Sequence, residues 1–327
     1  MSALIVENIA LADQQQHAEK VFPLALQCLT ADAQLSDVQQ WIQADLTNLE
    51  SKLNQHGAIL FRGFPLRSAD SFDAFITAFG FPNFPYDQSL SNAVRINRTA
   101  RVFTANEAPA EVTIRLHHEM AQTPIYPSKL FFFCQQSPEL GGATPICRSD
   151  VLLQQLSQQA PGFVHDCQEK GLQYMHVMPA EADLQSGMGR SWQSTFQVVE
   201  REQAEQRMAK LGYSWQWLAD GSLRATTPVL PAVRELLSGK QSFFNQLIAF
   251  AQTGLESRDD SSLAITLGDG SPLDAEAVLL ASELSEELTF DIPWQTGDVA
   301  LLDNFAVMHG RRNFQGTRQV LASLVAA

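Results

Sequence analysis

Two histidines and one glutamate in this 327-residue chain could bind a metal ion. His117 and Glu119 are separated by one residue, and His309 lies close to the C-terminus. Residues i and i+2 of an extended segment project from the same face, so His117 and Glu119 could reach one ion while His118 points away. Two imidazoles and one carboxylate leave one face of an octahedral ion open, which is typical of non-haem Fe(II) oxygen chemistry. The spacing therefore predicts a facial metal site.

Other interpretations of these three residues stay open at this point. A His-x-Glu pair is common by chance, and alone it has about one chance in ten of binding metal. Zinc is a second candidate metal, because His₂Glu zinc sites catalyse hydrolysis. The His-Glu-x-x-His pattern of zinc proteases is absent, since Gln122 stands where its second histidine would be. His309 could also be a buried structural histidine beside Arg311 and Arg312.

Two further residues could bind a dicarboxylate near such a metal. Arg318 follows His309 by nine residues, on what the pattern predicts as the last long strand. A buried guanidinium offers a planar, two-pronged donor for a carboxylate. Thr144 follows two glycines and an alanine, so its hydroxyl would lie at the end of a tight turn. Together they could hold the far carboxylate of a co-substrate whose keto-acid end chelates iron, although a lone arginine more commonly forms a surface ion pair.

The composition limits the class of protein and its partners. Hydrophobic residues make up 45% and charged residues 18%, as in a globular protein. The 22 basic and 36 acidic residues give a net charge of −14, which argues against a nucleic-acid partner. No apolar run approaches the length of a membrane span, and the N-terminal apolar run is too short and uncharged for a signal peptide. The four cysteines include no Cys-x-x-Cys pair, which favours a reduced, cytoplasmic location.

The elements that must position the candidate site are mainly strands. Alternating or continuous apolar patterns predict strands at residues 57–65, 129–134, 172–177, 196–199, 223–227, 262–267, 288–292, 298–302 and 318–324. Helical periodicity or capping signals occur at residues 36–57, 68–80, 149–171, 198–212 and 229–253. The loop-rich stretch 83–115 precedes the metal motif and is expected to border the pocket. No repeat or low-complexity linker divides residues 1–327, which favours a single domain.

Several motifs, in a fixed order, resemble one enzyme family over residues 55–325. The chain is similar to the Fe(II)/2-oxoglutarate dioxygenases of the taurine dioxygenase (TauD/TfdA) superfamily, and above all to its clavaminate synthase-like and syringomycin-biosynthesis aspartate hydroxylase branch. The motifs that carry the resemblance include Ile114-x-x-His117-x-Glu119-Met120, Pro127-x-Lys129-Leu130-x-Phe132-Phe133-Cys134, Gly141-Gly142-x-Thr144-Pro145, Trp294-Gln295-x-Gly297-Asp298-Val299, Asp303-Asn304 and His309-Gly310-Arg311-x-x-Phe314-x-Gly316-x-Arg318.

The resemblance implies a fold, cofactors and residue roles. The fold would be mainly β with surrounding helices, built on a double-stranded β-helix or jelly-roll core. His117, Glu119 and His309 would bind Fe(II), and Thr144 with Arg318 would bind 2-oxoglutarate, with O₂ as the other co-substrate. Related halogenases replace the carboxylate ligand with a small residue, so the presence of Glu119 favours hydroxylation or another oxidation over halogenation.

The resemblance also implies a class of small-molecule substrate. The implied substrate is an amino acid or amino-acid-derived intermediate of specialised metabolism such as antibiotic biosynthesis, either free or tethered to a carrier protein. A taurine-type sulfonate dioxygenase, a zinc hydrolase and a metal-free jelly-roll binding protein are the alternatives. Residues 180–195 are the candidate lid over the site. The candidate substrate contacts, for each of which a structural ion pair is the alternative, are Arg98, Arg101, Arg115, Asn245, Asn304, Arg311 and Arg312.

Overall fold

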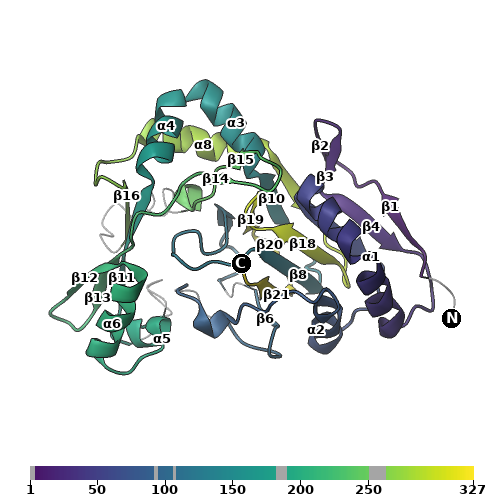
Figure 1. Cartoon of the computed structure of the whole chain (residues 1–327). Coiled ribbons are helices and arrows are strands. Elements are labelled where there is room, and N and C mark those ends of the chain that lie inside the picture. The colour runs from purple at the N-terminus through teal and green to yellow at the C-terminus, as the bar shows by residue number, and fades with distance from the viewer. Residues whose placement is uncertain (1–3, 92–94, 106–107, 182–189, 250–262) are drawn as a thin grey trace.

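Two β-sheets that share a hydrophobic core form the centre of the molecule (Figure 1). The computed structural model describes residues 4–91, 95–105, 108–181, 190–249 and 263–327. The larger sheet has seven strands in the order β1 (Val6–Ile9), β4 (Leu24–Cys28), β5 (Ala58–Arg62), β18 (Val299–Asp303), β8 (Lys129–Gln136), β21 (Gln319–Val325) and β6 (Phe103–Thr104). The smaller sheet has the order β17 (Thr289–Ile292), β10 (Thr144–Arg148), β19 (Val307–Arg311) and β7 (Ile114–His117).

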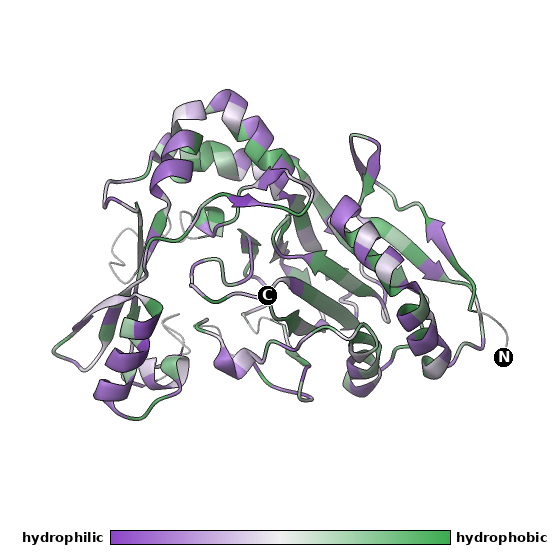
Figure 2. Ribbon diagram, in the orientation of Figure 1, coloured by the Kyte–Doolittle hydropathy of each residue, from purple (hydrophilic) through white to green (hydrophobic). Residues whose placement is uncertain are grey.

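The side chains between these sheets are apolar on both sides. Leu60 and Phe132 of the larger sheet belong to the same buried cluster as Ile146 and Val307 of the smaller one. Phe131 and Phe133 project from the other face of β8 and pack with the helices outside it. Burial on both faces explains why β8 is a continuous apolar run, and Figure 2 shows the same hydrophobic character along the central strands. The predicted mainly-β, jelly-roll architecture is confirmed.

Two helices cover the outer face of the larger sheet. Helix α1 (Leu35–His56) and helix α2 (Ala69–Thr77) pack there, as predicted for residues 36–57 and 68–80. Gly57 ends α1 in a left-handed conformation, and the Ser68 hydroxyl caps the start of α2 by accepting from the Ser71 amide. Fully burying one phenylalanine such as Phe75 stabilises the fold by about 1.5–3 kcal/mol.

A second group of helices covers the smaller sheet. Leu116, Cys147 and Met308 of that sheet share a buried cluster with α3 (Ser149–Gln159), α4 (Pro161–Lys170) and α8 (Ala275–Glu287). The first two helices match the prediction for residues 149–171, divided in two by Pro161. Helix α8 did not figure among the predicted elements, although Asp274 caps it by accepting from two backbone amides.

A third sheet, also of four strands, lies to one side of the two-sheet core (Figure 1). Its strand order is β12 (Ser214–Trp217), β13 (Leu223–Thr226), β11 (Leu172–Met178) and β16 (Leu263–Leu267). Helices α5 (Trp192–Phe196) and α6 (Arg201–Leu211) pack on β11 and β13 through their own buried cluster. The remaining elements are short: β2 (Gln15–His17), β3 (Lys20–Phe22), η1 (Tyr86–Gln88), β9 (Leu140–Gly141), β14 (Arg234–Glu235), β15 (Gln241–Ser242) and β20 (Phe314–Gln315).

Two predicted elements are wrong. The strand predicted at 196–199 is the end of α5 followed by a turn, with Gln197 in a left-handed conformation. In the region predicted as helical, 229–253, residues 234–242 form the β14–β15 hairpin, and among the described residues of this region a helix begins only at Leu247. The helical spacing of apolar residues predicted that Leu237 lies on a buried helix face. In the structure it lies at the tip of the hairpin and is 92% exposed. The single-domain organisation stays a prediction, and no helix in the described ranges has the length and apolarity to cross a membrane.

Candidate metal centre

His117, Glu119 and His309 lie together at the end of the smaller sheet. One ligand atom from each lies within 4.8 Å of the others, and no other such group of three occurs among the described residues. The two histidines are direct partners across β7 and β19, and their ring centroids are 4.4 Å apart. Oε2 of Glu119 lies 3.4 Å from Nε2 of His309. The three side chains therefore converge on one point.

The path of the chain to Glu119 differs from the predicted one. Strand β7 ends at His117, and Glu119 lies in the turn that follows, where Met120 has a positive φ of 60°. The turn, rather than strand alternation, brings Glu119 beside the histidines. His118 is fully buried elsewhere, with Nδ1 2.5 Å from the carbonyl oxygen of Asn304 and its ring against Phe244. His118 thus lies apart from the three converging groups. The sequence analysis predicted this outcome from alternation along a strand, whereas the structure achieves it through the turn after His117.

Asn304 occupies a position behind the metal residues rather than in front of them. Its side-chain oxygen accepts from the Glu119 amide at 2.8 Å. Its side-chain nitrogen donates to the carbonyls of Glu119, at 3.0 Å, and Pro127, at 2.7 Å. Asn304 is 0% exposed and both of its N–H donors are used. This geometry does not support the predicted substrate contact of Asn304, because its side-chain amide is already hydrogen-bonded to the turn that contains Glu119.

The electrostatics favour the metal-binding forms of two of these residues. Burial, with the neighbouring His309, lowers the pKa of His117 to about 4, so the imidazole is neutral near pH 7. Nδ1 of His117 lies 2.7 Å from the carbonyl of Arg115 and carries the proton, which leaves the Nε2 lone pair for a metal. Burial raises the pKa of Glu119, but the hydrogen bond from His309 and the charge of Arg95 outweigh it and lower the pKa to about 2.

One cavity joins this group to the predicted dicarboxylate clamp. Its polar lining comes from Arg95, His117, Thr144, His309, Arg311 and Arg318. Arg318, just before β21, donates to the carbonyl of Gly142 at 2.8 Å and to the hydroxyl of Thr144 at 3.2 Å. Trp294 also donates to that hydroxyl at 2.9 Å. Because Thr144 accepts both bonds, its own proton is available for an anion in the cavity.

Arg311 lines the cavity but is held by the backbone. Its guanidinium donates to the carbonyls of Ala108, Pro109 and Val112 at 2.6–2.7 Å, and the residue is 5% exposed. Three carbonyl acceptors satisfy most of its donors. Its position therefore fixes the chain that leads into β7, and the predicted direct substrate contact is the weaker interpretation.

Three predicted arginines lie outside the cavity. Arg98 and Arg115 are exposed, and neither lines the space around His117. Arg101 donates to the carbonyl of Phe81 at 3.2 Å and belongs to the outer loop. These arginines were predicted as substrate contacts from sequence proximity to the metal motif, which does not determine where a long side chain points.

Asn245 and Arg312 also have other partners. Asn245 donates to the carbonyl of Ala232 at 3.2 Å and accepts from the Leu247 amide at 3.0 Å, within a buried loop. Arg312 forms ion pairs with Glu286 at 2.6 Å and Asp291 at 2.9 Å on the outside of the smaller sheet. Neither residue lines the cavity, so the geometry does not support the predicted substrate contacts, which stay predictions.

Arg95 is a cavity residue that the sequence analysis missed. It lies in the loop-rich stretch 83–115 that was expected to border the pocket, and this expectation was the only sequence feature that could have pointed to it. No motif in the sequence marks it. Of the predicted lid, residues 182–189, including Gly187 and Gly189, lie outside the described part of the chain.

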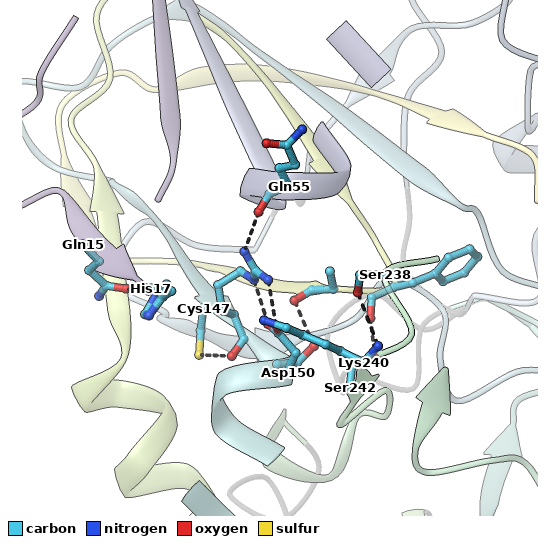
Figure 3. Close-up of polar contacts among 12 residues, drawn as sticks. Gln15, His17, Gln55, Cys147, Asp150, Ser238, Lys240 and Ser242 are labelled. Carbon is cyan, nitrogen blue, oxygen red and sulfur yellow. Dashed lines mark hydrogen bonds and ion pairs between the residues drawn. The ribbon is translucent and has the colours of Figure 1, made fainter. Parts of the chain in front are cut away.

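A second polar cluster lies at the other end of β10 (Figure 3). Arg148 and Asp150 form a buried two-pronged ion pair, with both bonds at 2.7 Å, and Lys240 lies 3.8 Å from the same carboxylate. Two open hollows of about 500 and 570 Å³ flank this pair. The buried charges here are paired with each other, so the cluster supports the junction of α1, β10 and the β14–β15 hairpin.

Comparison with known proteins agrees with this geometry. The family model described as taurine catabolism dioxygenase TauD, TfdA family matches residues 20–324. A clavaminate synthase-like protein of Arabidopsis thaliana is 39% identical over 331 residues, covering 99% of each chain. The dapdiamide synthesis protein DdaC of Enterobacter agglomerans is 31% identical over 291 residues, covering 85% of this chain and 84% of its own.

A solved structure shows the same fold at low identity. PvcB from Pseudomonas aeruginosa aligns with a TM-score of 0.56 at 14% identity, covering 100% of this chain and 92% of its own. PvcB is described as an Fe, alpha-ketoglutarate dependent oxygenase from an isonitrile synthetic pathway. With the family model spanning nearly all of the sequence, the chain belongs to the TauD/TfdA family of dioxygenases.

Proposed function

We propose that this chain is an Fe(II)- and 2-oxoglutarate-dependent oxygenase. His117, Glu119 and His309 bind the iron, and Thr144 with Arg318 binds the distal carboxylate of 2-oxoglutarate. The observation that carries the proposal is that the two converging histidines and the Thr144–Arg318 pair line the same cavity. Two imidazoles and a carboxylate are the donor set that Fe(II) oxygenases use, and they leave one face of the ion open.

The residues around the site have separate tasks in this reaction. When bound, the iron, 2-oxoglutarate and O₂ supply an oxidation in which 2-oxoglutarate becomes succinate and CO₂ and a substrate C–H bond is hydroxylated. Arg318 and the Thr144 hydroxyl orient the co-substrate through charge-assisted hydrogen bonds. Phe132 and Val320 line the same cavity and exclude water from it.

The substrate in this proposal is an amino acid or an amino-acid-derived molecule of specialised metabolism. DdaC, a dapdiamide synthesis protein, and PvcB, from an isonitrile synthetic pathway, support this class. Oxidation of a sulfonate is the alternative, supported by the name of the family model. A cytoplasmic location is part of the same proposal, and the four cysteines are free and buried.

A zinc hydrolase would use the same three ligands but would not need Thr144 and Arg318. The two functions are separated by measuring succinate release from 2-oxoglutarate, with Fe(II) or Zn(II), across a panel of free and carrier-tethered amino acids. The oxygenase requires O₂ and Fe(II) and forms succinate in proportion to oxidised product. Absence of succinate under all of these conditions, with zinc-dependent hydrolysis of a panel member, would contradict the proposal.

A further inference from the structure

Arg95 lines the cavity and has no ion pair or hydrogen bond among the described residues. Its Nε atom is buried without a hydrogen-bond partner, and no carboxylate lies within ion-pair distance in the described part of the chain. The guanidinium carbon lies over the ring of Tyr86, 5.5 Å from the ring centroid. A buried donor without an acceptor costs free energy, so the unpaired Nε of a cavity arginine indicates a ligand that supplies the acceptor.

The backbone around Arg95 is fixed to the larger sheet. The next residue, Ile96, donates to the Thr104 hydroxyl at 3.1 Å and accepts from the Thr104 amide at 2.9 Å. Thr104 belongs to β6 and is buried. The Tyr86 ring beneath Arg95 is buried and lies 5.0 Å from the ring of Phe103. The guanidinium is therefore presented from an anchored loop, as a binding group must be.

The other arginines that line the cavity already have acceptors. Arg311 is held by three backbone carbonyls, and Arg318 pairs with the distal carboxylate of 2-oxoglutarate. Glu119 and the keto-acid carboxylate offset the two charges of Fe(II). None of the side chains that line the cavity is a carboxylate. The charges of Arg311 and Arg95 remain, and because backbone carbonyls already accept from the Nη groups of Arg311, Arg95 is the better placed to meet an anionic group of the substrate.

We propose that Arg95 binds the α-carboxylate of the substrate, so the substrate is a free amino acid or related carboxylic acid. An aminoacyl group tethered to a carrier by a thioester has no free α-carboxylate to place there. The inference rests on the proposed function and deepens it by choosing between its two substrate forms. Ala105, Ile114 and Phe132 line the same space and provide an apolar surface for the body of such a molecule.

The test uses the full-length protein with Fe(II) and 2-oxoglutarate under anaerobic conditions. The probes are the twenty common L-amino acids and their C-terminal amides, and the readout is the change each causes in the visible charge-transfer band. We expect at least one acid to perturb the band and its amide to bind at least tenfold more weakly. Arg95→Gln should weaken binding of that acid by about 10- to 100-fold and leave the amide unaffected, because one charge-assisted interaction is lost.

Two further variants separate a binding role from a structural one. Arg98→Gln, at an exposed position of the same loop, should bind the acid as the wild type does. Arg95→Lys should recover part of the affinity, because it keeps the charge without the planar fork. Equal binding of acid and amide, unchanged acid binding by Arg95→Gln, or a panel with no response would overturn the inference. So would loss of the band itself in Arg95→Gln, since Arg95 would then support the iron or 2-oxoglutarate. Absence of the band in the wild type would instead count against the proposed function.

Discussion

The carboxamide of Asn304 holds the peptide groups on both sides of Glu119. It accepts from the Glu119 amide at 2.8 Å and donates to the Glu119 carbonyl at 3.0 Å. The turn it holds includes Met120 in a left-handed conformation, which a non-glycine residue adopts at an energetic cost. Asn304 therefore offsets that cost and sets the direction of Glu119, the candidate carboxylate ligand.

Replacing Asn304 should weaken metal binding without removing a ligand. Asn304→Asp keeps the acceptor but loses both N–H donors, so the Glu119 and Pro127 carbonyls lose their bonds. We expect Co(II) affinity, measured by titration of the visible spectrum, to fall by about 10- to 100-fold, as is typical when a group that orients a ligand is lost. Asn245→Ala is the matched control, because it removes an equally buried asparagine outside the cavity. If both variants bind Co(II) equally well, Asn304 has no orienting role.

The clamp residues should affect 2-oxoglutarate and not the metal. Arg318→Lys loses the planar fork and Thr144→Val loses the hydroxyl donor, so each should raise the KM for 2-oxoglutarate by about 10- to 100-fold. Co(II) affinity should stay within about twofold of the wild type, since neither side chain belongs to the ligand set. Arg312→Gln, which breaks exposed ion pairs outside the cavity, is the control. A change in KM as large in the control would remove the special role of Arg318.

The junction between α1 and β5 should be sensitive to one methyl group. Gly57 has a φ of +77°, and a Cβ there would lie 2.9 Å from Cγ2 of Val307 and 3.0 Å from Cδ of Arg148. Gly57→Ala should lower the free energy of unfolding, measured with urea, by about 2–4 kcal/mol from strain and overpacking. Gly270→Ala, with a φ of +81° but open space around it, should cost about 1 kcal/mol from backbone strain alone. Equal costs would show that the neighbours of Gly57 yield without penalty.

Residue type, spacing and the family resemblance together predicted that His117, Glu119 and His309 converge, and the structure brings them together, while their binding of metal stays a prediction. His117, Glu119 and His309 could be selected because metal ligands are of few chemical types, and Thr144 and Arg318 because a tight turn and a late arginine suit a dicarboxylate. The helices ending at Gly57 and beginning at Ser68 carried their own cap residues. Each of these features can be recognised from residues that are close together in the sequence.

The surroundings of the site depend on contacts between distant segments, and there the predictions fail. Asn304 was assigned to the substrate because sequence does not reveal whether a buried amide faces a ligand or the backbone of Glu119. Arg95 was missed because its place in the cavity depends on the pairing of Ile96 with Thr104. The β14–β15 hairpin was read as a helix because its apolar spacing fits both elements, and the exposed Leu237 decides between them.

The metal ligands themselves provide the most direct test of the whole account. Fe(II) and 2-oxoglutarate are added anaerobically to the wild type and to His117→Ala, Glu119→Ala and His118→Asn. We predict a weak visible charge-transfer band in the wild type, its loss in the first two variants, and its survival in any folded His118→Asn protein, because His118 lies outside the converging group. Absence of the band in the wild type, or its retention in both His117→Ala and Glu119→Ala, would contradict the account.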